Sequence, residues 1–591
     1  MAQKVGIDFG TTNSLISVVL SGQVKYFVDG KGLPHPSVVA YTGAEPLVGK
    51  RAKLQLDGVG SGVIGNVIKS PKTFLGKGGV FVEGREYQPA DIVRDLMQGL
   101  KEEALADSDH AVVDSCDFDH AVVSIPVAMD GRARRELRDA MMQAGIHITQ
   151  FVHEPLAALY GHFRSSGNLE NMLERYHNKL ALVFDWGGGT LDLTLCLISN
   201  GWVTQIMNVG NNQVGGDHID EALLSYVREQ HLISNGLSEL PQVMPGANAR
   251  LLNACEATKI KLSKKSSDYV YVENYFDLED ENKRDIEIEI TRGDLDRISE
   301  TIVQQGLNNI DELLVGLKID QRRIALCLAT GGMINMPKIN QRLLETFSID
   351  RLEISDRGDK IISEGCAWMA ADGCHLTLAK PVEIVEARQS YTKAFREGTL
   401  LPGEGEVCHE KHTLHIVDPR DGKAKIQLCR PVHVGKCGAA DPRLNYSMLT
   451  LKVDSEAPAF FERIPVDMTI DQDLILTIIA SSDPTGDADK DEIYDLEFGL
   501  KLSKGVAVDR EKKTPDFEVT PEMSQHEKYS VCSRSNVTTK DGAEPEHKYL
   551  IPGECLEPFD NRAGNIPEIQ IRERLYFSES VTEYGTFKYS D

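Results

Sequence analysis

Residues 181–192 read ALVFDWGGGTLD, and this stretch decides the fold of the chain. Two short apolar runs flank three consecutive glycines, a pattern that predicts two buried strands joined as a hairpin. Because glycines carry no side chains, their backbone N–H groups are open to an anion. Asp185 could hold a hydrated cation, and Thr190 could offer its hydroxyl to a phosphate oxygen. Taken alone, the stretch fits an ordinary glycine hairpin equally well.

The N-terminus repeats this pattern. Residues 5–14 read VGIDFGTTNS, and the apolar run Leu15–Val19 follows. Again an apolar run ends in an acid, here Asp8, which is followed by a glycine and two hydroxyl side chains. Two such turns, about a domain's length apart, indicate duplicated halves whose acids and glycines converge on one phosphate chain and one divalent ion. Neither turn is a Walker-type loop or a Gly-x-Gly-x-x-Gly loop.

Composition limits the class of protein. The chain has 591 residues, 41% hydrophobic and 26% charged, which is typical of a soluble protein with roughly four domain-sized units. Its formal net charge of −26 should repel nucleic acid and anionic membranes, although it leaves room for a local basic groove. We therefore expect no nucleic-acid partner and no membrane partner. The sequence shows no long apolar segment and no signal peptide, and its eleven cysteines include no Cys-x-x-Cys pair. These features predict reduced thiols and a cytoplasmic protein.

Strands and helices alternate up to about residue 372, which predicts α/β architecture. A third glycine turn, Thr330-Gly331-Gly332, follows an apolar strand over 324–329. Thr291 is a plausible cap for a helix over 292–317. In the expected helix 247–262, Glu256 and Lys259 share a face with Ser263 just beyond its end, which alone would be a polar surface row. The other helices are expected at 87–106, 131–145, 156–163, 221–232, 337–347 and 359–371.

Seven segments occur in the order of one known ATPase. They are Val5–Ser14, Ala121–Pro126, His153–Gly161, Phe184–Asp192, Gly215–Asp220, Cys255–Ser263 and Thr330–Pro337. They resemble the nucleotide-binding domain of the 70-kilodalton heat-shock chaperones, the DnaK family. The resemblance covers roughly residues 1–372 and implies the actin and hexokinase fold, with two lobes around ATP or ADP and Mg²⁺.

The resemblance also implies roles for individual residues. Lys72 would neutralise charge on the γ-phosphate, and Glu154 or Asp192 would orient the attacking water. Asp8 and Asp185 would hold Mg²⁺, largely through water. Pro126 and Arg134 match positions that the family uses to pass nucleotide state between domains. The catalytic set is Lys72, Glu154, Asp185, Asp192 and Thr190, and the nucleotide-binding set is Gly10, Thr11, Thr12, Asn13, Gly187, Gly188, Gly189, Gly215, Gly216, Asp217, Glu256, Lys259, Ile260, Ser263, Gly331, Gly332, Met333, Asn335 and Asp359.

The adenine end departs from the family pattern. Ile260 and Asn335 stand where the family clamps the base between two arginines, and Met333 replaces a small hydroxyl residue. Isoleucine can pack on the base, but the cation–π contact is lost. Each lost contact is worth about 0.5–1 kcal/mol, so we expect ATP to bind about fivefold to thirtyfold more weakly than to a typical family member.

The pattern changes beyond residue 371. Residues 373–381 stand where the family has an acidic, leucine-rich linker, but only alternating leucines remain. Short alternating strands over 382–503 predict a β-sandwich that resembles the family's peptide-binding domain. Residues 504–591 contain six prolines, which argue against the family's long helical lid and predict an irregular or β-rich extension, with β-like pieces such as Ile569–Phe577.

Two function classes remain. The first is an ATP-hydrolysing chaperone in which nucleotide state controls the binding of polypeptide by the β-domain, with J-domain or nucleotide-exchange co-chaperones as possible partners. The second is a specialised ATP switch dedicated to one partner, which the missing lid and altered linker favour. A sugar or metabolite kinase on the same fold is the weakest interpretation, because the β-domain has no role in it.

Overall fold

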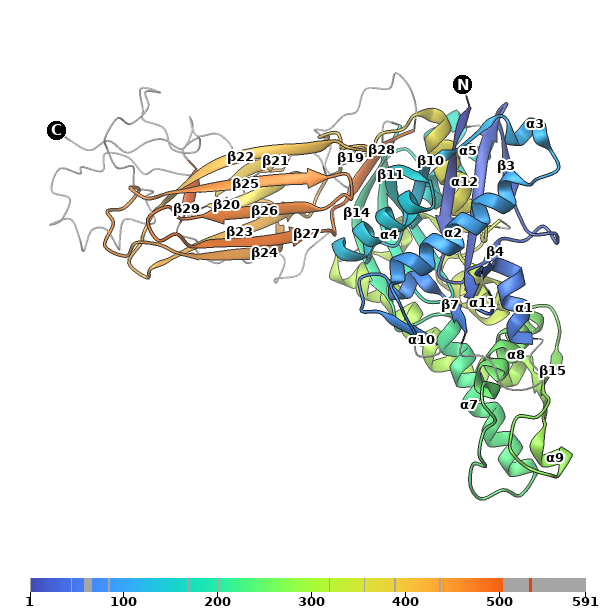
Figure 1. The fold of residues 1–591 in the computed structure, drawn as a ribbon. Coiled ribbons are helices and arrows are strands. Elements are labelled where there is room, and N and C mark those ends of the chain that lie inside the picture. The colour runs from blue at the N-terminus through green and yellow to red at the C-terminus, as the bar shows by residue number, and fades with distance from the viewer. Residues whose placement is uncertain are drawn as a thin grey trace, which may run out of the picture. The chain divides into compact units, whose positions relative to one another are not determined.

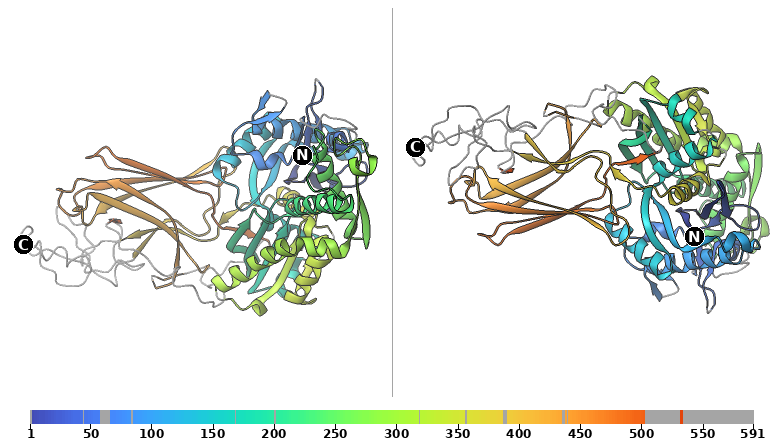
Figure 2. Two further views of the ribbon diagram at one scale, coloured as in Figure 1. Left: turned by 90° about the horizontal axis from the view of Figure 1, so that it is seen from below. Right: turned by 90° about the horizontal axis from the view of Figure 1, so that it is seen from above.

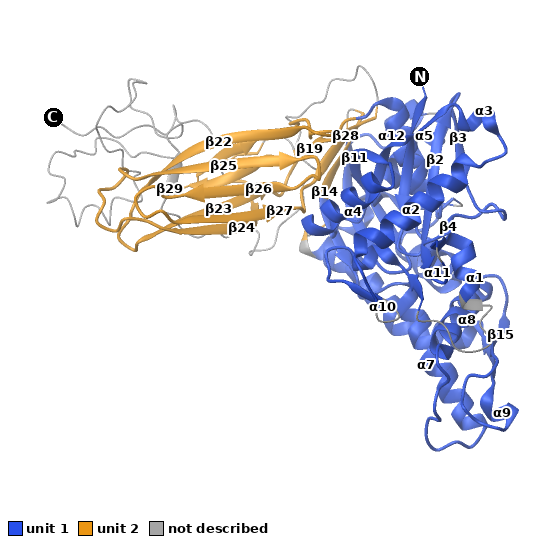
Figure 3. Ribbon diagram, viewed as in Figure 1, with its two compact units in different colours: residues 1–198, 207–315, 320–374 blue, residues 199–206, 316–319, 375–591 orange. Residues whose placement is uncertain are grey.

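A computed structural model describes residues 2–502 and 531–533, apart from residues 44, 58–65, 83–84, 168, 200, 318, 356, 387–389, 435–436 and 439. The chain divides into two compact units (Figure 3). Unit 1 contains residues 1–198, 207–315 and 320–374, and unit 2 contains residues 199–206, 316–319 and 375–591. Except for residues 531–533, the predicted C-terminal extension, including Ile569–Phe577, lies outside the described residues.

Two sheets of unit 1, whose ribbon Figure 1 shows, share one pairing pattern. In the first, β1 (Gln3–Phe9) pairs parallel with β10 (Cys116–Ile125) and antiparallel with β2 (Asn13–Leu20). In the second, β12 (Lys179–Trp186) pairs parallel with β17 (Ile324–Thr330) and antiparallel with β13 (Leu191–Ser199). The predicted hairpin is therefore present, and the repeated pattern agrees with duplicated halves. Further strands are β11 (His147–His153), β3 (Gln23–Phe27) and β4 (His35–Pro36) in the first sheet and β18 (Leu352–Ile354) in the second.

Each predicted helix is present, and four further helices, α1 (Gly49–Asp57), α3 (His110–Val113), α6 (Leu169–Arg175) and α9 (Glu281–Arg284), were not predicted. Two of the predicted helices, α8 (Ala247–Leu262) and α11 (Pro337–Phe347), have the predicted bounds. At the start of α10 (Arg292–Gly316), the Asp294 N–H donates to the Thr291 hydroxyl at 3.1 Å, which confirms the predicted cap. The others are α2 (Pro89–Leu105), α4 (Gly131–Gln143), α5 (Glu154–Ser165), α7 (Gly216–Ser234) and α12 (Ile361–Asp372).

Three smaller sheets complete unit 1. One joins β5 (Val38–Ala40), β6 (Leu47–Val48) and β7 (Val67–Lys69), and the others pair β8 (Val80–Val82) with β9 (Arg85–Tyr87) and β15 (Ser267–Val272) with β16 (Ile286–Thr291). Short 3₁₀ turns lie at Pro71–Phe74, Gln321–Arg323 and Gly332–Asn335. The third of these turns contributes Gly332 and Met333 to the cavity described below, and the first carries Lys72, which contacts the lining residue Glu154.

Helix α12 packs so closely against β1 and α5 that their backbones are in contact. A Cβ on Gly6 would lie 2.1 Å from the Ala367 nitrogen, and a Cβ on Gly365 would lie 1.8 Å from the Ala157 oxygen. The Ser17 and Ser363 hydroxyls, both buried, are 2.7 Å apart. Glycine is required at these positions because neighbouring backbone occupies the space that any side chain would need. Residues more than 200 positions apart thus form one packed layer.

Unit 2 contains the predicted β-sandwich, and Figure 2 shows its two sheets as layers. Both sheets are antiparallel, and inward residues alternate with exposed ones, as in β25. The first sheet has the order β21 (Ser390–Phe395), β20 (Val382–Glu386), β23 (Lys423–Pro431) and β24 (Arg443–Lys452). The second has the order β27 (Ala488–Ile493), β26 (Leu476–Ser481), β25 (Arg463–Asp471), β22 (Val407–Ile416) and β29 (Val531–Ser533).

Two further short strands of unit 2 were not predicted. The first residues of β14 (Trp202–Asn211) pair with β28 (Phe498–Lys501), which pairs in turn with β19 (Thr377–Leu378). Four-residue and two-residue strands carry too little periodicity to be recognised in sequence. Among the described residues, no helix has the length and apolar character needed to span a bilayer.

Candidate functional site

The glycine turns of unit 1 meet around one cavity of about 220 Å³. Segments from β1, β12, α7, α8, β17 and α12 or their adjoining turns contribute its wall. The cavity is lined by Asp8, Gly10, Thr11, Thr12, Asn13, Glu154, Asp185, Gly187, Gly188, Gly189, Thr190, Gly216, Asp217, Asp220, Glu256, Lys259, Ile260, Gly331, Gly332, Met333, Gly358, Asp359 and Ile362.

The triple-glycine turn packs against the start of α7. The Gly187 N–H donates to the Thr190 carbonyl at 2.9 Å, which closes the turn. The Asp217 N–H then donates to the Gly188 carbonyl at 2.8 Å. A Cβ on Gly215 would lie 2.4 Å from the Gly188 oxygen, so these segments approach more closely than any other residue would permit. This contact explains why α7 begins at Gly216, five residues before the predicted start.

The two phosphate-loop candidates approach each other across the cavity. A Cβ on Gly188 would lie 2.0 Å from the Thr12 hydroxyl oxygen, and one on Gly189 would lie 3.0 Å from the Thr11 methyl group. The Thr12 hydroxyl is buried and has no hydrogen-bond partner among the described residues. Because a buried hydroxyl normally has a partner, this group fits a ligand oxygen. The glycine cradle and the unpartnered hydroxyl together fit a phosphate.

Three aspartates lie close together beside the glycine turns. Asp185 lies directly opposite Asp192 in the β12–β13 hairpin, and the Ser124 hydroxyl donates to Asp8 at 2.8 Å. Burial, followed by the charge of Glu154, raises the pKa of Asp8 to about 6 and that of Asp192 to about 7. Burial and the neighbouring carboxylates also raise the pKa of Asp185. Such a cluster favours either protonation or a bound cation.

Lys72 supplies the positive charge beside these acids. Its Nζ lies 2.6 Å from Glu154 Oε1 and donates to the Phe9 carbonyl at 2.5 Å. The Lys72 and Glu154 side chains are only 4% and 9% exposed. The turn at Pro71–Phe74 carries Lys72, and Glu154 is the first residue of α5, where its charge also suits the helix N-terminus. An ammonium and a carboxylate are thus held in fixed positions at the cavity.

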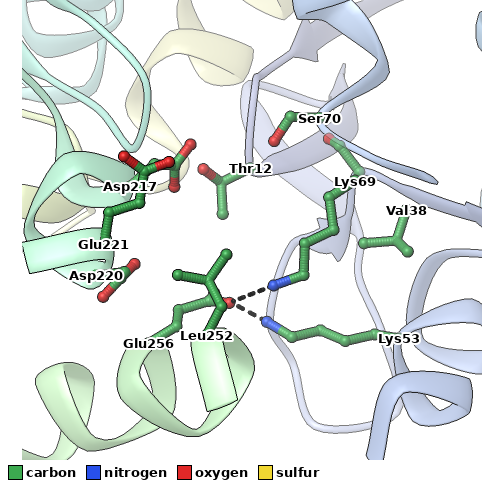
Figure 4. A pocket seen from close by; sticks show the side chains of 11 residues that line it. Thr12, Val38, Lys53, Lys69, Ser70, Asp217, Asp220, Glu221, Leu252 and Glu256 are labelled. Carbon is green, nitrogen blue, oxygen red and sulfur yellow. Dashed lines mark hydrogen bonds and ion pairs between the residues drawn. The ribbon is translucent and has the colours of Figure 1, made fainter. Parts of the chain in front are cut away.

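Two lysines that were not predicted as site residues hold Glu256. Lys53 from α1 and Lys69 from β7 lie 2.9 Å and 3.4 Å from its carboxylate oxygens (Figure 4). Burial raises the pKa of Glu256, but the neighbouring ammonium groups lower it by more, so the net shift is downward. They border a second cavity of about 180 Å³, which adjoins the first and shares Thr12, Asp217, Asp220 and Glu256 with it.

The Lys259 ammonium also has partners at the cavity wall. Its Nζ lies 2.7 Å from the Asp220 carboxylate and donates to the Gly216 carbonyl at 2.9 Å. Burial raises the pKa of Asp220 to about 7 despite the neighbouring ammonium. The pair therefore joins α8 to the start of α7 at the cavity wall. Asp220 was not predicted as a site residue, although it belongs to the recognised segment Gly215–Asp220.

The apolar end of the cavity is built from Ile260, Met333 and Ile362. Ile260 is 57% exposed, whereas Met333 is 3% exposed. Asn335, the other predicted base contact, is exposed and donates to the Gly332 carbonyl at 3.1 Å. Among the described residues, Lys259 is the only cationic side chain in the cavity lining, and its Nζ is paired with Asp220.

Most of the predicted site residues are brought together. Lys72 contacts Glu154, Asp192 pairs with Asp185, and Gly215 contacts Gly188. Lys72, Asp192 and Gly215 do not themselves line the cavity. Ser263 and Asn335, both in the described part of the chain, also lie outside its lining. Arg134 is buried and its Nε donates to the Met129 carbonyl at 3.0 Å. Gly358 and Ile362 were not predicted, because no motif marks them.

The acidic cluster makes a testable prediction about pH. A carboxyl whose pKa is raised in the folded state stabilises the protein below its unfolded pKa, and this stability is lost as pH rises through the folded pKa. For Asp8 and Asp192 the loss falls between about pH 4 and 7. We expect Asp192→Asn to raise the free energy of unfolding of the ligand-free protein at pH 7.5 by at least about 1 kcal/mol, with a smaller effect at pH 5. Thermal unfolding of this variant and of the exposed control Asp114→Asn measures both effects. A loss of stability at pH 7.5 would contradict the prediction.

Comparison with known proteins gives consistent matches. A family model described as "Hsp70 protein" matches residues 4–375. The chaperone protein DnaK of Metamycoplasma hominis is 27% identical over 369 residues, which cover 62% of this chain and 58% of that protein. The chaperone protein DnaK of Thermoplasma volcanium is 27% identical over 533 residues, which cover 87% of this chain and 81% of that protein. The first match thus spans little more than half of its relative, whereas the second extends beyond residue 375.

Proposed function

This chain belongs to the Hsp70 family, and we propose that it is an ATP-hydrolysing chaperone whose nucleotide state controls the binding of polypeptide. The observation that carries the proposal is the meeting of two glycine loops at a buried, unpartnered Thr12 hydroxyl, beside the acids and Lys72. The family implies a two-lobed, actin-like ATPase domain and a β-sandwich. We further propose the domain limits 1–372, 373–381, 382–503 and 504–591.

Each group at the phosphate end has a chemical task under this proposal. Thr12 and the backbone N–H groups of Gly187–Gly189 would bind phosphate oxygens. Lys72 would neutralise charge that develops on the transferred phosphoryl group, and Glu154 or Asp192 would orient the attacking water and accept its proton. Bound Mg²⁺ would supply further charge neutralisation. Asp8 and Asp185 would hold it through water, since Mg²⁺ usually keeps several of its own waters.

The partners are proposed on the same basis. Polypeptide clients would bind to the β-sandwich by main-chain hydrogen bonds, and J-domain or nucleotide-exchange proteins would act on the ATPase domain. The clustered carboxylates destabilise the ligand-free protein. A bound nucleotide with its metal ion should therefore also stabilise unit 1 against unfolding. The chaperone role is preferred over a switch dedicated to a single partner, because both curated relatives are named as chaperones.

Peptide affinity measured with ATP and with ADP tests the proposal. A coupling of about 1–3 kcal/mol predicts that unrelated apolar peptides bind about 5-fold to 150-fold more weakly with ATP. The Thr190→Ala variant should retain ATP and prolong the low-affinity state. Equal affinities in both nucleotides would overturn the proposal, and capture of one stoichiometric protein by this variant would instead support a dedicated switch.

The apolar end of the cavity predicts weak binding of the base. We expect the double variant Ile260→Arg with Asn335→Arg to bind ATP about fivefold to thirtyfold more tightly, because each guanidinium can restore one cation–π contact. The exposure of both positions leaves space for the longer side chains. Titration calorimetry measures the change, and Tyr271→Arg, exposed on β15, controls for added charge. Unchanged affinity would show that neither position faces the base.

A further inference from the structure

The predicted linker is part of a β-ladder within unit 2. Gly499 of β28 lies opposite Thr204 on one side and opposite Thr377 on the other. Beyond the strands, the Ala379 N–H donates to the Glu497 carbonyl at 2.9 Å, and the Leu502 N–H donates to the Gly201 carbonyl at 2.7 Å. The ladder thus continues past both ends of β28. A segment that follows β27 in sequence therefore lies between the linker and residues 201–204.

The linker is also paired along its other edge. The Leu378 N–H donates to the Thr399 carbonyl at 2.9 Å, and the Gly398 N–H donates back to the Leu378 carbonyl at 2.8 Å. Leu376 and Leu378 are each at most 1% exposed. The alternating leucines that remain from the family's linker pattern are therefore core residues. A chain segment bonded on both edges and buried between them is a structural strand rather than a tether.

A buried ionic cluster fastens the ladder at one end. Lys380 Nζ donates to the Ile206 carbonyl at 2.6 Å and lies 3.5 Å from Glu497. Glu497 also lies 2.9 Å from Arg430 Nε of β23. The side chains of Lys380 and Glu497 are only 2% and 1% exposed. Because removing one member of a buried ion pair leaves an uncompensated charge, each member depends on the others being in place.

We propose that residues 495–502 form a strap that keeps the linker paired in every nucleotide state, with Lys380, Glu497 and Arg430 as its lock. The linker in this protein then does not alternate between a bound and a released form. A signal that reaches residues 201–206 passes into the sandwich through paired backbone and buried charges. The inference uses the proposed function only to define the nucleotide states that are compared.

Four contacts specify the strap and distinguish it from casual strand pairing. The Phe498 N–H donates to the Gln205 side chain at 2.8 Å, and both residues are fully buried. A Cβ on Gly499 would lie 3.0 Å from the Thr377 hydroxyl and 3.8 Å from the Trp202 ring, so the strap passes closely between them. Arg430 also lies 4.4 Å from the Tyr446 ring centroid, which fixes the guanidinium from β24. The strap is thus tied to the linker, to residues 202–205 and to the sandwich.

Hydrogen exchange of the full chain tests the strap. With ADP and with ATP, the amides of Leu378, Ala379 and Leu502 should show protection that differs by less than about twofold. A drop of tenfold or more at Leu378 and Ala379 in one nucleotide would overturn the proposal. Nucleotide protection of residues 187–190, read in the same spectra, reports separately whether the ATP site is loaded. Failure of the proposed ATP function is thereby distinguished from failure of the strap.

A variant of the lock provides a second test of the proposal. Glu497→Gln keeps the shape of the side chain but removes its charge, so protection of Ala379 and Leu502 should fall about tenfold or more in both nucleotides. Asp483→Asn, an exposed site on the same unit, removes the same charge and should leave these amides unchanged. Unchanged protection in Glu497→Gln would overturn the assignment of the lock. If this variant fails to fold, the wild-type comparison above still decides the proposal.

Discussion

Lys72→Met is expected to slow single-turnover ATP hydrolysis by about 10²–10³-fold, the usual cost of removing one preorganised group that stabilises developing charge. Its ammonium lies 2.6 Å from Glu154 and contacts the Phe9 carbonyl, so its position is fixed before any nucleotide binds. The variant should also be less stable by about 3–5 kcal/mol, because Glu154 becomes a buried, unpaired charge.

The double variant Lys72→Met with Glu154→Gln separates these two effects. It removes the unpaired charge, so stability should return toward the wild-type value while hydrolysis remains slow. Lys77→Met, an exposed lysine after the same turn, is the matched control and should behave as the wild type. If the double variant regained hydrolysis together with stability, Lys72 would be a structural residue and the chemical task proposed for it would be wrong.

Gly215→Ala is the second variant with a large expected effect, and it should weaken ATP binding about 30-fold to 700-fold. Its added Cβ would lie 2.4 Å from the Gly188 oxygen and 2.7 Å from the Gly189 carbonyl carbon, both of which are backbone atoms that cannot rotate away. The glycine turn and α7 would have to separate, with loss of the 2.8 Å bond from Asp217 to Gly188. Strain and lost hydrogen bonds together cost roughly 2–4 kcal/mol.

The expected effect comes from the steric clash of the added Cβ and not from a strained backbone conformation. Gly215 has an extended backbone, with φ of −165°, that any residue can adopt. Gly78→Ala is the control, because an added Cβ there meets nothing within 4 Å. Calorimetric titration with ATP compares the variants, and circular dichroism checks that each is folded. Affinity within threefold of the wild type in Gly215→Ala would show that the two segments can part without harm to the site.

The sequence predicted those parts of the site that local pattern encodes. Glycine turns, strand-ending acids and the Thr291 cap are visible because each depends on residues within a few positions of one another. Of the residues that line the cavity, all but Asp220, Gly358 and Ile362 were therefore named from the sequence. The hairpin, with Asp185 opposite Asp192, agrees with the pattern of residues 181–192.

What could not be predicted depends on distant partners. Lys53 and Lys69 resemble solvated lysines in the sequence, and only the fold places both of them against Glu256. The same applies to Ile362, which reaches the cavity from α12. The strap was missed for a related reason, since β28 is a short strand whose partners lie some 120 and 300 residues earlier in the chain. Pairing at such separations leaves no periodic trace in sequence.

The contact between Gly6 and Ala367 has a consequence for biosynthesis. Strand β1 is among the first segments to leave the ribosome, yet the helix that covers it is made 361 residues later. At translation rates of about 5–20 residues per second, β1 waits roughly 20–70 s for that helix. During this interval the apolar face of the first sheet has no cover from α12. The nascent chain of this chaperone-family protein should itself therefore depend on protection by other chaperones until its first 372 residues have been made.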